Sequence, residues 1–106
     1  TAVVTLAAGQ RIIAWGSAEL ALLTGTTQSF DGDVGWQPSA GGTISNAAGF
    51  NYMTSEASTT RHPYPANGVI NPGAGTWRIG LLVRNTGAGS LSDNDYVNFT
   101  YMIVNQ

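Results

Sequence analysis

Lysine and cysteine are both absent from this chain of 106 residues, histidine occurs once, and only 9% of the residues are charged. Without cysteine there can be no disulfide framework and no thiolate metal site. The single histidine, His62, excludes a metal site or a proton relay that needs two histidines. The four arginines are scattered and the net charge is −2, whereas binding to phosphate backbones needs clustered positive charge. We therefore expect no nucleic-acid partner.

Long apolar runs are also missing. No segment approaches the roughly 18 apolar residues of a membrane-spanning helix, so we expect no insertion into a membrane. The chain starts Thr1-Ala2-Val3-Val4, without methionine and without the basic region of a signal peptide, which is typical of a processed mature protein or of a domain cut from a longer one. A surface made soluble by hydroxyls and amides suits a secreted, extracellular or virion-surface location.

Apolar and polar residues alternate most clearly in the last third of the chain. The segments Thr76–Arg84 and Val97–Ile103 both show the period of two that marks a half-buried strand. A loop rich in Gly, Ser and Asn separates them, so we expect the two strands to pair antiparallel. The residues expected to face the core are Trp77, Ile79, Leu81, Val83, Val97, Phe99, Tyr101 and Ile103.

The first part of the chain holds one clear strand and one ambiguous segment. Ala2–Leu6 reads as a short strand that ends before Gly9. Gln10–Leu23 places apolar residues on one strand face, but Ser17–Leu23 also contains good helix formers. We favour a strand, and a short helix remains open.

The middle of the chain, residues 24–75, is dominated by pairs of turn residues. Turn signals at intervals of about 8–12 residues are typical of a β-sandwich or barrel. Between them we expect short strands at Gln28–Phe30, Val34–Gln37, Gly49–Thr54 and Gly68–Ile70. The whole chain, residues 1–106, is therefore predicted to be a single-domain, all-β, antiparallel sandwich of jelly-roll type.

Two segments carry a resemblance to a known family. Gly68–Ile79 contains Pro72-Gly73-Ala74-Gly75-Thr76-Trp77 between two strands, and Leu91–Val97 has the form Leu-x-x-x-Asp-x-Val. These two motifs resemble the segments at which strands begin in C1q-like and TNF-like jelly rolls. They are also similar to the C-terminal ends of bacteriophage fibre and head-decoration proteins and of bacterial surface proteins. The resemblance implies a trimeric, non-catalytic module used for adhesion or assembly.

Catalytic patterns are scarce. A serine nucleophile would need His62 as its base, and no Gly-x-Ser-x-Gly elbow is present. His62 lies in Arg61-His62-Pro63-Tyr64-Pro65, which reads as a stiff, exposed loop. The histidine either packs on Tyr64 or contacts a ligand. We expect no enzyme activity and no cofactor.

Carboxylates are paired twice, as Asp31 with Asp33 and as Asp93 with Asp95. Both pairs are typical of tight turns. The alternative is calcium, which prefers six to eight oxygen ligands, but neither motif continues with the further acids that a loop site needs. We favour the turn interpretation, with Asp31, Asp33, Asp93 and Asp95 as the calcium alternative.

Aromatic residues lie among amides and acids in the middle of the chain. Sugars bind with their C–H faces on aromatic rings and with their hydroxyls on amides and carboxylates. The predicted ligand-binding residues are Trp36, Tyr52, His62, Tyr64, Asp33 and Asn67. The opposing interpretation is that Trp36 fills the core.

These observations leave two function classes open. The first is a lectin-like module that binds a carbohydrate or receptor on an outer surface. The second is a structural virion component, such as a capsid-decoration or fibre-head module, whose partner is protein. In both cases the low surface charge predicts a symmetric homo-oligomer, preferably a trimer with an apolar axis.

Overall fold

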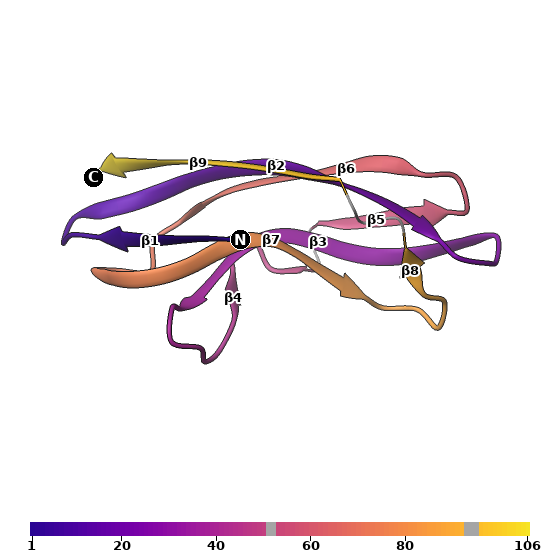
Figure 1. Ribbon diagram of the computed structural model, residues 1–106, viewed down its shortest axis with the longest axis horizontal. Coiled ribbons are helices and arrows are strands. Elements are labelled where there is room, and N and C mark those ends of the chain that lie inside the picture. Colours follow the sequence, from indigo (N-terminus) through magenta and orange to yellow (C-terminus); the bar gives the residue numbers. More distant parts are fainter. Residues whose placement is uncertain (51–52, 93–95) are drawn as a thin grey trace.

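The chain folds into two packed antiparallel sheets (Figure 1), as the predicted sandwich requires. The computed structural model describes residues 1–50, 53–92 and 96–106, and no α-helix occurs in these ranges. The molecule is elongated along the strands, with extents of 47 × 23 × 22 Å. Its strands are β1 (Ala2–Leu6), β2 (Gln10–Leu22), β3 (Thr27–Pro38), β4 (Ser45–Asn46), β5 (Thr54–Ser58), β6 (His62–Ile70), β7 (Gly75–Asn85), β8 (Leu91–Ser92) and β9 (Val97–Asn105).

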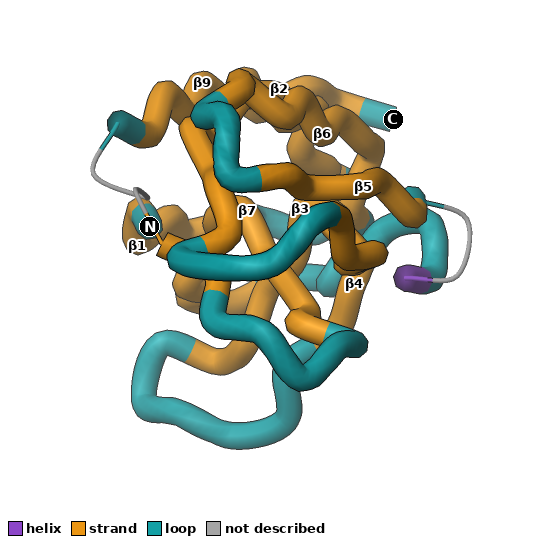
Figure 2. Tube along the Cα trace, turned by 90° about the vertical axis from the view of Figure 1, so that its right-hand side faces the viewer, coloured by secondary structure: helices purple, strands orange, loops and turns teal. Residues whose placement is uncertain are grey.

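Each sheet is built around one long central strand. In the first, here called sheet A, β3 pairs with β7 on one side and with β5 and β4 on the other, and β1 pairs with β7. In the second, sheet B, β2 pairs with β6 on one side and with β9 and β8 on the other. The two layers are separate in the view along the strands (Figure 2). The free edges of sheet B are therefore β6 and β9.

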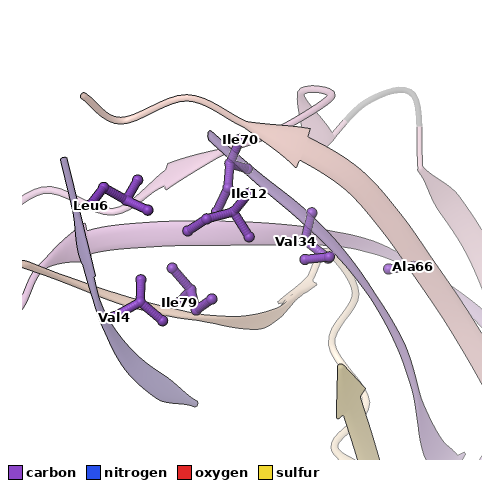
Figure 3. Close-up of a cluster of buried hydrophobic side chains, with 8 residues drawn as sticks. Val4, Leu6, Ile12, Val34, Ala66, Ile70 and Ile79 are labelled. Carbon is purple, nitrogen blue, oxygen red and sulfur yellow. The ribbon is translucent and has the colours of Figure 1, made fainter. Parts of the chain in front are cut away.

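The main core lies between the sheets and comes from alternate residues of facing strands. Ile12 and Ile70 of sheet B and Val34 and Ile79 of sheet A are at most 1% exposed. Figure 3 shows these side chains, with Val4 and Leu6 of β1, converging on the same space. A second buried cluster surrounds Phe30. Burial of one face of each strand is what the period-two pattern predicts.

The segment over residues 10–23 is a strand, as favoured, and the short helix is not formed. Its even-numbered residues face the core: Ile12, Ala14, Ala18, Leu20 and Leu22 are all at most 7% exposed. Gly16 also lies on β2, where its backbone meets β9 closely. A Cβ at Gly16 would come within 2.1 Å of the Asn98 carbonyl oxygen, so only glycine fits this position.

The pairing predicted between the last two long strands is wrong. β7 belongs to sheet A and pairs with β1 and β3, whereas β9 belongs to sheet B and pairs with β2. The prediction of which β7 side chains face the core is correct near the centre of the strand, since Ile79 is buried and Trp77 and Leu81 pack against the core. Val83 at its end is 45% exposed.

Three further local predictions need correction. Asp31-Gly32-Asp33 is the interior of the continuous strand β3 and not a turn between two strands. The expected loop around His62 and Tyr64 is the first half of β6, in which Pro63 and Pro65 sit opposite β2 at a sheet edge. Within the described part of Gly49–Thr54, only Thr54 belongs to a strand, the first residue of β5.

Candidate functional site

Asp33 is fully buried on the face of β3 that points away from the core. Its Oδ1 accepts a hydrogen bond from the Val34 backbone N–H at 2.8 Å. Its Oδ2 accepts from the Asn46 side-chain amide at 2.8 Å and from the Ala48 backbone N–H at 2.9 Å. The donors from Asn46 and Ala48 join β4 and the segment after it to the central strand of sheet A. Asp33 is therefore a structural anchor with 0% exposure, and it does not present its carboxylate to a surface ligand.

Asp31 lies two residues earlier on the same face and is held by a different set of partners. Its Oδ1 accepts from the Thr54 hydroxyl at 2.7 Å, and its Oδ2 accepts from Nε of Arg84 at 3.0 Å and also from Nη2. The Arg84 guanidinium lies over the Phe50 ring, 4.7 Å from the ring centroid. The hydrogen bond from Arg84, followed by that from Thr54, lowers the pKa of Asp31 below its ordinary value of 3.8.

This lowered pKa predicts an acid-sensitive contribution to stability. Above pH 3.8 Asp31 is ionised in both the folded and unfolded chain, and the contribution of the Asp31–Arg84 pair to the free energy of unfolding is fully present. As the pH falls below 3.8 toward the lower folded pKa, the unfolded chain binds the proton first, and the contribution is lost. The difference in unfolding free energy between the wild type and Asp31→Asn, measured in urea from pH 7 to pH 2, should therefore shrink below pH 3.8. A difference that stays constant with pH would contradict this role of the pair.

The described residues provide no further ligands for the calcium site that was considered as the alternative. Asp93 and Asp95 lie outside the described residues, and Asp31 and Asp33 each already accept hydrogen bonds at both oxygens. In the part of the chain that the structure describes, no group of three or more His, Asp or Glu side chains could hold a metal ion. The two carboxylates of β3 act as acceptors for protein donors.

Two of the aromatic residues predicted to bind a ligand are packing residues. Trp36 is half-buried and packs against the main core, which is the opposing interpretation given above. Tyr64 packs edge-on against Phe30, with ring centroids 4.8 Å apart, and its hydroxyl donates to the Glu56 carbonyl at 2.7 Å. Burial raises the pKa of this phenol. Trp36 lies on a strand, as expected, whereas Tyr64 lies on β6 and not on the expected loop.

The remaining predicted ligand residues are dispersed. His62 is exposed at the start of β6, and Asn67 is exposed near its centre. Tyr52 lies outside the residues that the structure describes. The structure thus does not bring Trp36, His62, Tyr64, Asp33 and Asn67 together into one pocket, because they lie on both faces of two different sheets.

Asn67 does border a hollow, on the outer face of sheet B. This hollow, called here the Trp15 hollow, has a volume of about 510 Å³ and is lined by Trp15, Gly16, Ser17, Pro65, Ala66, Asn67, Asn98 and Thr100. Trp15 lies at its centre, since its partners across the sheet are Asn67 on β6 and Thr100 on β9. The sequence carries a signal for this residue: Ile12, Ala14, Ala18 and Leu20 share one face of the strand, which places Trp15 on the opposite, solvent face.

A second open feature lies where the sandwich ends at β9, between the two sheets. This groove, called here the β9 seam, has a volume of about 280 Å³ and is lined by Thr1, Ala18, Leu20, Leu81, Val83, Leu91, Val97 and Phe99. None of these described lining residues has a charged side chain. The strand itself, Val97–Asn105, contains neither a charged residue nor a proline, and its only partner among the described strands is β2.

The side chains of β9 that face the interior remain partly uncovered. Val97, Tyr101 and Ile103 are 55%, 38% and 39% exposed, although their partners on β2 are buried. Phe99 alone of the predicted inward set on β9 packs against the main core. The prediction that these residues face inward is correct in direction, but sheet A leaves Val97, Tyr101 and Ile103 partly exposed.

Comparisons of the chain with protein-family models, with curated proteins and with solved structures found no match in any of the three. Within residues 1–50, 53–92 and 96–106, no helix has the length and hydropathy to cross a membrane. The assignment of function therefore depends on the two surface features, the β9 seam and the Trp15 hollow.

Proposed function

We propose that this chain is a non-catalytic assembly module of an extracellular or virion surface, in which copies of the chain join through the β9 seam. The observation that carries this proposal is the exposure of Val97, Tyr101 and Ile103 on the inward face of a free edge strand. Exposed apolar side chains beside unpaired backbone groups favour association with another chain.

The two free edges of sheet B differ in how well they resist such association. β6 carries Pro63 and Pro65, which cannot donate backbone hydrogen bonds to an added strand. The nine residues of β9 include no proline and no charged residue that would oppose the addition of a strand. The difference favours β9 as the edge at which a partner joins.

A second copy of this chain is the partner that fits best. The described side chains of the seam and of the strand beside it are uncharged, so these side chains bring no like charges together when two copies approach. The whole chain has only ten charged residues, six acidic and four basic, to oppose association. The resemblance to C1q-like and TNF-like modules favours three copies in the assembly.

The interpretation as an assembly module also agrees with the positions of the aromatic rings. Trp36 and Tyr64 contribute to the packing of the sandwich and do not form a groove of loop aromatics for a sugar. The described carboxylates Asp31 and Asp33 are occupied by protein donors, and His62 stands exposed at a strand end. This arrangement favours a structural role over catalysis.

Two valine-to-lysine variants test the proposal. Val97 in the seam and Val3 on the outer face of β1 have nearly equal exposure, 55% and 59%, and both lie on edge strands. Sedimentation equilibrium should give the wild type a mass that is a multiple of 11.0 kDa, with three chains expected. Val97→Lys should sediment as single chains, because the ammonium would be desolvated against an apolar partner surface. Val3→Lys should keep the wild-type mass.

Circular dichroism should show strand structure in both variants, so that loss of assembly is distinguished from loss of folding. A wild type that sediments as a single 11.0 kDa chain at high concentration would overturn the proposal. So would equal masses for the two variants.

A further inference from the structure

The Trp15 hollow combines one exposed aromatic ring with uncharged polar groups. Trp15 is 41% exposed on a sheet face, although a tryptophan of this size usually finds cover in a folded chain. The polar side chains around it are two amides, Asn67 and Asn98, and two hydroxyls, Ser17 and Thr100. None of the described residues that line the hollow is a lysine, an arginine or an acid.

The polar side chains of the hollow have no hydrogen-bond partner among the described residues. Asn46 and Asn85 donate their amides to other parts of the fold, and the indole N–H of Trp77 donates to the Gly73 carbonyl at 3.0 Å. Over the described part of the chain, the side chains of Trp15, Asn67, Asn98, Ser17 and Thr100 have no such intramolecular partner. A patch of unused donors and acceptors around an open ring is suited to a ligand that brings its own hydroxyls.

The geometry points to a neutral carbohydrate, built from hexose-type rings, as the ligand of the Trp15 hollow. An indole face accepts the C–H face of a pyranose ring, and amides bind sugar hydroxyls as both donor and acceptor. The volume of about 510 Å³ lies within the range of small-molecule sites. Because the described lining residues are uncharged, they offer no ion pair to a sialylated or sulfated glycan.

The backbone holds this surface in place. Trp15 occupies the central strand of sheet B, with a hydrogen-bonded neighbour on each side. Gly16 lets β2 and β9 approach closely, which brings Asn98 beside the hollow. A ligand site on three paired strands needs little ordering when it binds, which reduces the entropic cost of recognition.

This site is separate from the β9 seam. Asn98 and Thr100 of β9 line the hollow on the outer face, whereas Val97 and Phe99 line the seam on the inner face of the same strand. Alternation along β9 keeps the two sets of side chains on opposite faces. Sugar binding and assembly can therefore be tested independently of each other.

The test is a glycan array with a neutral arm and an anionic arm, followed by calorimetry with the neutral oligosaccharides that bind. The neutral arm holds oligosaccharides of hexoses and N-acetylhexosamines, and the other arm holds sialylated and sulfated glycans. The wild type should bind in the neutral arm, with an affinity that changes little between low and high salt. Trp15→Ala should weaken that binding by about tenfold or more, and Asn67→Ala should weaken it to a smaller extent.

The matched control is Val69→Ala, which changes another exposed side chain of sheet B, 52% exposed, that does not line the hollow. It should bind as the wild type does. Sedimentation of Trp15→Ala should give the wild-type mass, so failure of this inference is distinguishable from failure of the assembly proposal. The inference is overturned if the wild type binds no neutral glycan, or if it binds only anionic glycans. It is also overturned if Trp15→Ala binds with the same affinity as the wild type, or if the assembly of Trp15→Ala is altered.

Discussion

Replacing Phe30 by alanine should lower the free energy of unfolding by about 3–5 kcal/mol, a large part of the stability of a domain of this size. Phe30 is 1% exposed and is the largest fully buried side chain. It lies in the second buried cluster with Ala18, Leu20, Leu22 and Ala57, and its ring is the surface on which Tyr64 packs. Its removal would enlarge a cavity of about 20 Å³ that already adjoins the ring.

Urea unfolding followed by tryptophan fluorescence measures this effect, because Trp36 and Trp77 both pack against the neighbouring core. The comparison should be made at one protein concentration, since assembly makes apparent stability depend on concentration. Leu23→Ala is the control: Leu23 is 69% exposed and its truncation should change stability by no more than about 0.5 kcal/mol. If Phe30→Ala does not fold, Phe30→Leu should still show a clear loss. Equal midpoints for the Phe30 and Leu23 variants would contradict the packing described here.

The strands with local periodicity could be predicted from the sequence. Ala2–Leu6 is observed with the expected bounds, and the segment from Gln10 forms a strand with its apolar positions inward. The alternation of side chains along a strand is a property of the strand itself, so it is visible in the sequence without knowledge of the partners.

Features that depend on distant residues could not be predicted in the same way. Asp31-Gly32-Asp33 has the composition of a turn, but it continues as strand because donors from residues 46, 48, 54 and 84 satisfy its carboxylates. The partner of β9 is likewise set by the crossing of the chain to the other sheet, which no pattern within Val97–Ile103 reveals.

In the candidate site, too, some features follow from the local sequence and others depend on distant residues. Tyr64 next to two prolines resembles a loop residue, and only its contact with Phe30, 34 positions earlier, makes it part of the core. Trp15, in contrast, stands on the polar face of a strand whose register the sequence already indicates. Among the predicted ligand residues that the structure describes, only Asn67 lies beside it.

Replacing Asp33 by alanine should lower the free energy of unfolding by about 3 kcal/mol, at roughly 1 kcal/mol or more for each of the three donors left without an acceptor. The donors are the backbone N–H groups of Val34 and Ala48 and the amide of Asn46, and the last two attach β4 and the segment after it to β3. Asp33→Asn should also destabilise, because its amide would direct a donor at one of these donors. Thermal unfolding checks both variants, with Glu56→Gln as an exposed carboxylate control.

The same experiment decides between the structural role of Asp33 and calcium binding. A carboxylate that accepts three protein donors and is 0% exposed has no lone pair directed at solvent. Addition of calcium or of a chelator should therefore leave the melting temperature of the wild type unchanged, whereas both Asp33 variants should melt at lower temperatures under all three conditions. A melting temperature that rises with calcium in the wild type, and that no longer does so in Asp33→Asn, would instead assign this carboxylate to a metal ion.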